Sequence, residues 1–107
     1  MVSTSSIKKQ VIEALEDIKA FDIVSLDVKK QTSISDFMVV ASASSTRQAK
    51  ALARNIKDKM NLAGIDIIGI EGESEGDWVL VDLGDIIVHI MTPTTRAYFN
   101  LEELWSN

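Results

Sequence analysis

Apolar residues near the start of the chain recur with a helical period, and two strand-like segments follow them. A hydroxyl of Ser5 or Ser6 can cap a helix. The apolar positions of this helix fall three and four residues apart, at Ile7, Val11, Ala14, Leu15 and Ile18. In residues 23–28 apolar and polar side chains alternate, which predicts a half-buried strand. After a polar loop at 29–35, the continuous apolar run 37–43 indicates a buried central strand.

The middle of the chain carries the pattern of a second amphipathic helix. Ser44, Ser45 and Thr46 are candidate N-caps. The apolar face that follows consists of Ala49, Leu52, Ala53, Ile56, Met60 and Ala63. Gly64 then stands where a left-handed residue commonly ends a helix. The short branched segment 66–70 reads as a strand, so strand, helix and strand together predict a βαβ unit.

The C-terminal part predicts a hairpin and a last helix. An acidic loop at 71–77 precedes two strands, 78–82 and 86–91, whose short connection contains Gly84. A helix over 95–105 then places four large side chains near one face, namely Tyr98, Leu101, Leu104 and Trp105. We therefore expect a single domain, 1–107, of the α/β (α+β) class. Its mixed sheet has about five strands with flanking helices, in the order αββαβββα.

Composition narrows the chemistry that this chain can perform. The 107 residues include no Cys and one His, which rules out disulfides, thiolate catalysis and zinc fingers and disfavours a transition-metal site. We expect no cofactor. The N-terminal residues show no signal-peptide pattern, and no window approaches the length of apolar chain that spans a membrane. The lack of Cys fits a cytoplasmic protein, and we expect no membrane contact.

The charges are divided unevenly between the two halves. Residues 1–57 hold nine Lys or Arg and six Asp or Glu, whereas residues 58–107 hold two and ten, for a net charge of −5. This balance argues against nonspecific binding of nucleic acid, which depends on neutralising phosphates. The acidic half suits a basic protein partner at least as well as a metal, and solvated loops are the simpler interpretation.

Polar candidates for an active site are weak. Asp82 and Asp85 flank a glycine and could share a Mg²⁺ ion, but Asp in a hairpin turn is also ordinary turn chemistry. Residues 42–47 open a helix and carry hydroxyls and Arg47, as an anion site would. They contain no glycine through which the backbone could approach a phosphate, so capping is the favoured role.

The most informative residue is Trp78. On alternation, Val79 and Val81 take the core side of their strand, which leaves Trp78 and Leu80 on the other side. His89, on the next strand, can lie on that same side. We hypothesise that these side chains form an exposed face that docks a partner, since Trp is enriched at interface centres. The alternative is that a helix covers this face and Trp78 belongs to the core.

His89 and a row of basic residues have both structural and functional interpretations. No Ser or Cys nucleophile is framed with His89 by an acid, so no catalytic triad can be argued, and a packed or hydrogen-bonded histidine is the simpler reading. A basic stripe recurs at spacings of three and four residues, at Arg47, Lys50, Arg54 and Lys57. It is either a solvated helix face or a contact for the phosphate backbone beside a protein docking site.

Longer segments resemble a known family. The stretch DWVLVDLGDIIVHIM at 77–91 and the stretch RAYFNLEELW at 96–105 resemble the signature of the ribosomal silencing factor family, also called Iojap-like. Upstream matches lie at 22–28, 33–48 and 70–73. The resemblance extends from about residue 12 to residue 106.

This resemblance implies a regulatory interaction and no catalysis. Members bind the large ribosomal subunit through large-subunit protein fourteen and block joining of the small subunit. Their fold is similar to that of nucleotidyltransferases. Among partners we also expect a minor contact with ribosomal RNA and a homodimer when the protein is off the ribosome. The partner-binding residues that we expect are Trp78, Leu80, Asp82, Asp85 and His89.

The alternative function is a nucleotidyltransferase-like enzyme that binds a nucleotide. Such an enzyme needs a Gly-Ser pair after a strand and two acids spaced i, i+2 on the next strand. Here Ser44 and Ser45 stand in place of Gly-Ser, and Asp82 and Asp85 lie three apart across a turn. The sequence therefore disfavours the enzyme.

Overall fold

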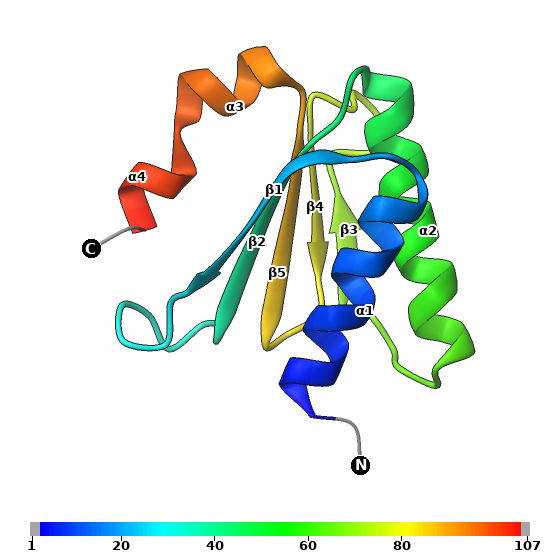
Figure 1. Cartoon of the computed structure of the whole chain (residues 1–107), viewed down its shortest axis with the longest axis vertical. Helices are drawn as coiled ribbons and strands as arrows, with labels where there is room; N and C mark the ends of the chain where they lie inside the picture. Colours follow the sequence, from blue (N-terminus) through cyan, green and yellow to red (C-terminus); the bar gives the residue numbers. More distant parts are fainter. Residues whose placement is uncertain (1–2, 106–107) are drawn as a thin grey trace.

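The computed structural model describes residues 3–105 as a five-stranded mixed sheet with helices on both of its faces (Figure 1). This confirms the predicted fold class. The elements in chain order are α1 (Thr4–Asp17), β1 (Phe21–Asp27), β2 (Phe37–Ser42), α2 (Thr46–Leu62), β3 (Gly69–Glu71), β4 (Trp78–Asp82), β5 (Ile86–Met91), α3 (Pro93–Phe99) and α4 (Leu101–Trp105).

The strands lie in the order β1-β2-β5-β4-β3. β2 and β5 run parallel at the centre, and every other neighbouring pair is antiparallel. The β4–β5 hairpin is present as predicted, with Gly84 at φ +88° in its turn. The chain does pass from β2 through α2 to a parallel strand, but β5 and β4 separate β2 from β3. Residues far apart in sequence therefore form the middle of the sheet.

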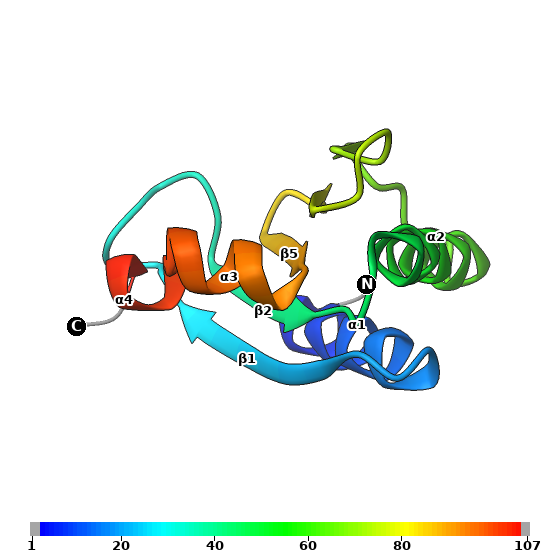
Figure 2. The ribbon, with the colours of Figure 1, turned by 90° about the horizontal axis from the view of Figure 1, so that it is seen from above.

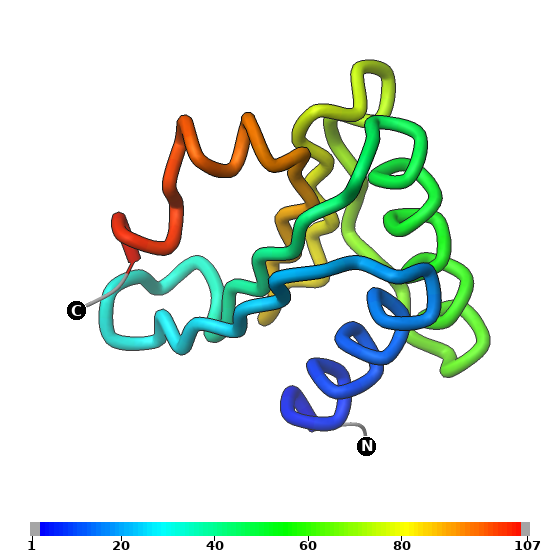
Figure 3. The backbone as a smooth tube through the Cα atoms, turned by 45° about the horizontal axis from the view of Figure 1, so that its top comes forward, coloured from blue at the N-terminus to red at the C-terminus, as the bar shows by residue number. Residues whose placement is uncertain are grey.

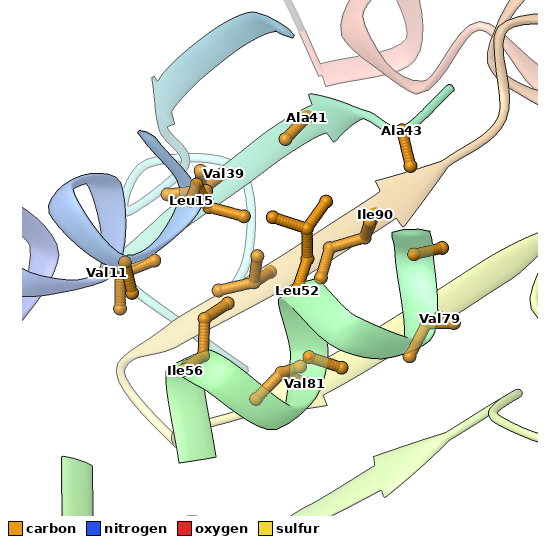
Figure 4. Packing of buried hydrophobic residues seen from close by; sticks show 14 of the residues in the cluster. Val11, Leu15, Val39, Ala41, Ala43, Leu52, Ile56, Val79, Val81 and Ile90 are labelled. Atoms are coloured by element: carbon orange, nitrogen blue, oxygen red, sulfur yellow. The ribbon is translucent and has the colours of Figure 1, made fainter. Parts of the chain in front are cut away.

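One face of the sheet packs against α1 and α2 and forms the main core (Figures 2 and 4). Val79 and Val81 point to this side, as their alternation predicts. The α2 side chains Leu52 and Ile56 pack against them and are fully buried. Small residues of β2, such as Ala41, let the helices approach closely. Burial of this apolar surface is the main source of stability.

Side-chain amides of α2 also fix the position of α1. Asn55 Nδ2 donates to the carbonyl of Ala14 at 2.8 Å, and Gln48 Nε2 donates to the carbonyl of Ile18 at 2.8 Å. Carbonyls in the last turn of a helix lack partners within the helix. The two helices are thus joined by hydrogen bonds as well as by apolar contact.

Several predicted boundaries are wrong by a few residues. The N-cap of α1 is Ser3, whose Oγ accepts from the Ser6 amide at 3.2 Å, in place of Ser5 or Ser6. Ala63 is the exposed C-cap of α2 and does not join its apolar face. β3 is shorter than the predicted 66–70, because Gly69 already pairs with Asp82, the last residue of β4. The residues before Gly69 therefore lie beyond the end of β4, next to the β4–β5 turn.

The predicted final helix is two helices. Asn100 adopts a left-handed conformation (φ +47°, ψ 55°) that ends α3, and Pro93 begins α3 two residues earlier than expected. The change of direction separates the four large side chains that were predicted to share a face. Leu101 and Trp105 pack against the sheet, whereas Tyr98 and Leu104 are 81% and 70% exposed.

The C-terminal helices and the loop between β1 and β2 lie side by side (Figure 3). Gln31, in that loop, donates from Nε2 to the carbonyl of Trp105 at 2.8 Å. Of the helices in the described part of the chain, none has the length and apolar character needed to cross a bilayer.

Candidate partner-binding face

The sheet face opposite α1 and α2, here called the second face, carries the residues proposed for docking. Leu80 of β4 pairs with His89 of β5, and Trp78 pairs with Met91. Because cross-strand partners lie on the same side of a sheet, Trp78, Leu80 and His89 share the second face as predicted. Asp82, two residues beyond Leu80, lies on the same side, so the structure brings four of the five predicted residues together.

His89 is not exposed, which corrects the expectation of an open face at this position. Only 6% of its surface is accessible. Its Nδ1 accepts a hydrogen bond from Trp78 Nε1 at 2.9 Å, so the ring is neutral with its proton on Nε2. Desolvation by burial lowers the pKa of His89 from 6.5 to about 4. His89 therefore orients Trp78, and its structural interpretation is correct.

Trp78 itself is half-buried, between the two alternatives that the sequence left open. Its ring lies 4.7 Å from that of Phe99, centroid to centroid, and Phe99 in turn contacts Tyr98 at 5.0 Å. A second apolar cluster continues beneath it, formed by Val28, Met38, Val40 and Met91 with Leu26, Leu101 and Trp105 packed against them. The C-terminal helices thus cover part of the second face, while Leu80 and Asp82 stay partly exposed.

Arg96 holds this cover in place, a role that the sequence patterns did not reveal. Its guanidinium donates from Nε to Glu102 at 2.7 Å, and from Nη1 to Ser42 Oγ at 2.8 Å and to the carbonyl of Asp22. Asp22 lies at φ +50°, in the irregular part of β1 where the register with β2 shifts. The hydrogen bond and charge of Arg96 lower the pKa of Glu102. One side chain therefore joins α3, α4, β1 and β2.

Asp82 and Asp85 both accept hydrogen bonds, but only that of Asp82 lies within the β4–β5 turn. Asp82 Oδ1 accepts from the amide of Gly84 at 2.9 Å, and Asp85 accepts from Thr4 Oγ1 at 3.4 Å. Within residues 3–105 no group of three or more His, Cys, Asp or Glu side chains is placed to hold a metal. Both carboxylates remain accessible to a partner, and the turn accounts for the presence of Asp82 alone.

The Ser-rich segment at 42–47 is a helix cap. Ser45 Oγ accepts from the amide of Gln48 at 3.1 Å, and Gln48 Oε1 accepts in return from the amide and hydroxyl of Ser44. This reciprocal arrangement satisfies donors that an anion would otherwise contact. The capping interpretation of these residues is therefore the one the structure supports.

Part of the basic stripe of α2 holds the acidic loop. Lys50 Nζ donates to the carbonyl of Ser74 at 3.3 Å, and Arg54 lies 4.0 Å from the carboxylate of Glu73. Arg47 and Lys57 are exposed and form no ion pair with another described residue. The stripe runs along α2, which packs against the sheet face opposite the second face (Figure 2).

The sequence of this chain matches a known protein family over almost its whole length. The family model described as "Ribosomal silencing factor during starvation" matches residues 3–107. The chain belongs to the ribosomal silencing factor family. The ribosomal silencing factor of Chromobacterium violaceum is 52% identical over 99 residues, which are 92% of this chain and 81% of that protein.

Solved structures and a more distant relative agree with this assignment to the silencing factor family. A crystal structure of a Chromobacterium violaceum protein superposes with a TM-score of 0.95 at 50% identity, covering 97% of this chain and 87% of that one. A mouse protein named "Mitochondrial assembly of ribosomal large subunit protein 1" is 29% identical over 99 residues, 90% of this chain and 43% of that protein. The resemblance inferred from residues 77–105 is confirmed.

Proposed function

We propose that this protein represses translation by binding the large ribosomal subunit and sterically blocking its joining with the small subunit. Membership of the ribosomal silencing factor family is the observation that carries the proposal. The name of the mouse relative, which refers to the ribosomal large subunit, supports the choice of subunit. In this proposal residues 1–107 act in the cytoplasm as one domain. Repression then requires only that the protein binds the large subunit at the surface where the small subunit joins, and no catalytic step.

The docking site in this proposal is the second face, and its partner is large-subunit protein fourteen. Trp78 supports this choice because His89 and Phe99 contact its ring and fix its orientation while the residue stays partly exposed. An aromatic side chain that is already ordered loses little conformational entropy on binding. Leu80 and Asp82 extend the accessible surface along the same strand. The partner-binding set is Trp78, Leu80, Asp82, Asp85 and His89, with His89 acting through Trp78.

Two further contacts complete the proposed interaction. The exposed cations Arg47 and Lys57 lie on α2, away from the second face, where they suit a minor contact with ribosomal RNA. A protein free of the ribosome leaves Trp78 and Leu80 of the second face partly exposed, which suits a homodimer that forms when the ribosome is absent.

The nucleotidyltransferase alternative receives no support from the geometry. The caps formed by Ser44 and Ser45 occupy the donors that a nucleotide phosphate would need. Asp82 accepts a hydrogen bond within the turn, and Asp85 accepts one from Thr4 at the start of α1. Two measurements distinguish these functions. Sedimentation with purified large subunits tests the repressor, and a nucleotide-binding assay tests the enzyme.

A subunit-joining experiment tests the main proposal. The protein is expected to pellet with isolated large subunits and not with small ones, and to lower the fraction of joined ribosomes in proportion to the amount added. If joining is unchanged at saturating binding, steric blocking is wrong for this chain.

A matched pair of leucine variants tests the docking face. Leu80→Ala removes a partly exposed side chain from the second face, whereas Leu62→Ala removes a 90% exposed one from the end of α2. We expect Leu80→Ala to weaken binding to large subunits about tenfold, as contacts near an interface centre do, and Leu62→Ala to leave it unchanged. Equal effects would place the interface elsewhere, with the basic stripe of α2 as the next candidate.

A further inference from the structure

A groove opens at the rim of the second face, between the acidic loop at 71–77 and the start of α3. Its volume is about 470 Å³. Trp78 and Phe99 form an aromatic wall, with their ring centroids 4.7 Å apart. Glu75 and Asp77 line the loop side. Aromatic rings and carboxylates therefore border the same space.

Two glycines hold the loop in this position. Gly72 has φ +87°, and a Cβ atom there would lie 2.1 Å from the carbonyl oxygen of Trp78. Gly76 has φ +83° and is buried, so close to α2 that a Cβ atom would lie 2.8 Å from the side chain of Thr46. The contact of Lys50 with the Ser74 carbonyl, described above, adds a third attachment. The acidic side of the groove is thus ordered before any partner arrives.

No positively charged side chain in residues 3–105 forms an ion pair with the carboxylates in the groove. Glu75 and Asp77 are exposed, and neither forms an ion pair with any side chain in residues 3–105. Other acids nearby behave differently, since Glu73 pairs with Arg54 and Glu102 pairs with Arg96. The two negative charges beside the aromatic wall can therefore pair with a positive charge on another molecule.

The combination of groups selects the chemistry of the occupant. The face of an aromatic ring carries negative electrostatic potential and attracts a Lys or Arg side chain. Two adjacent carboxylates add charge attraction and hydrogen-bond acceptors for the same group. They repel the phosphates of RNA, so the occupant is a protein.

We propose that this groove binds a lysine or arginine side chain of the protein partner that docks on the second face. The inference rests on the proposed function, because it assumes that a partner docks there, and it adds the chemical class that is recognised. The groove lies at the edge of the face, next to Trp78, so one partner can contact both.

Charge-neutralising variants with a matched control test this inference. The double variant Glu75→Gln/Asp77→Asn removes the groove charges, and the control Glu16→Gln/Asp66→Asn removes two exposed charges on α1 and in the loop before β3. The affinity of each for isolated large subunits is measured at several salt concentrations. We expect the groove variant to bind about tenfold more weakly at low salt with a shallower salt dependence, and the control to stay within twofold.

A third variant distinguishes a cation from an apolar occupant. Phe99→Leu keeps an apolar wall but removes the aromatic face, and a severalfold loss of affinity is expected. If the groove double variant binds within twofold of the unchanged protein, or more tightly, the occupant is apolar or is RNA and this inference is overturned. If the unchanged protein does not bind large subunits at all, the proposed function itself is wrong. Melting temperatures of the variants show that each is folded.

Discussion

The two faces of the sheet are built on different principles. Against α1 and α2, the side chains are apolar, and most have no accessible surface. On the second face, α3 and α4 contribute no buried residue, and polar groups such as Ser42 and His89 lie among the apolar ones. The first face is covered by a large apolar core, whereas the second combines a smaller apolar cluster with hydrogen bonds and is covered only in part. A loosely covered face with ordered aromatic residues suits recognition.

The largest expected difference between the faces is in stability. Leu52→Ala empties a fully buried site between α2 and the sheet and should lower the free energy of unfolding by about 3–4 kcal/mol. Leu101→Ala, on the partly covered face, should cost only about 1 kcal/mol. Urea unfolding of both variants measures the contrast. Equal losses would show that the second face is packed as a core.

Acid should weaken the second face through His89. Its pKa is lowered to about 4, so the unfolded chain takes up a proton first as the pH falls below 6.5. The stability associated with the neutral ring is complete above pH 6.5 and decreases towards pH 4 by about 1.4 kcal/mol per pH unit, about 3 kcal/mol in all. Unfolding between pH 7 and 4 measures this, with His89→Gln as the control. If His89→Gln shows the same pH dependence of stability as the unchanged protein, groups other than His89 cause it.

Removing Arg96 should release the cover without unfolding the core. Arg96→Met loses the hydrogen bonds to Glu102, Ser42 and Asp22, and we expect a loss of about 2 kcal/mol. Amide exchange should become faster in residues 93–105 while that of α2 changes little. Arg96→Lys keeps the charge but not the planar fork, so it should restore only part of the protection. Uniform acceleration across the chain would mean that the two faces form one cooperative unit.

The smallest effect concerns a single hydrogen bond. Trp78→Phe keeps an aromatic ring on the second face but removes the donor to His89 Nδ1. We expect a loss of about 1 kcal/mol in stability, since a buried acceptor loses its partner. The pKa of His89, followed by NMR, should change at the same time. An unaltered pKa would show that Trp78 and His89 are not coupled.

Much of the fold could be predicted because its patterns are local. The apolar spacing of α2 and the alternation in β4 each depend on neighbours within a few residues, and both gave the correct inward faces. The strand order could not be obtained in this way, because β2 lies next to β5 through contacts distant in sequence. Asn100 was missed for a related reason, since the apolar residues around it keep a helical spacing across the break.

The candidate site shows the same limit. Alternation correctly placed Trp78, Leu80 and His89 on one face. It could not show that His89 is buried, because the cover depends on where α3 and α4 fold back. That return is anchored by Arg96, whose partners come from β1, β2 and α4, and no periodicity in the sequence reports such contacts.

The parallel pairing of β2 with β5 has a consequence for the order of events during synthesis. Phe37 pairs with Ile86, and Ser42 with Met91, so about fifty residues separate the two central strands. When β2 leaves the ribosomal tunnel, only the antiparallel edge strand β1 is available to pair with it. One edge of a strongly apolar strand therefore stays unpaired until residues 86–91 have also emerged. Until then the nascent protein exposes the apolar strand β2 along that edge, and unpaired apolar strands of this kind favour aggregation.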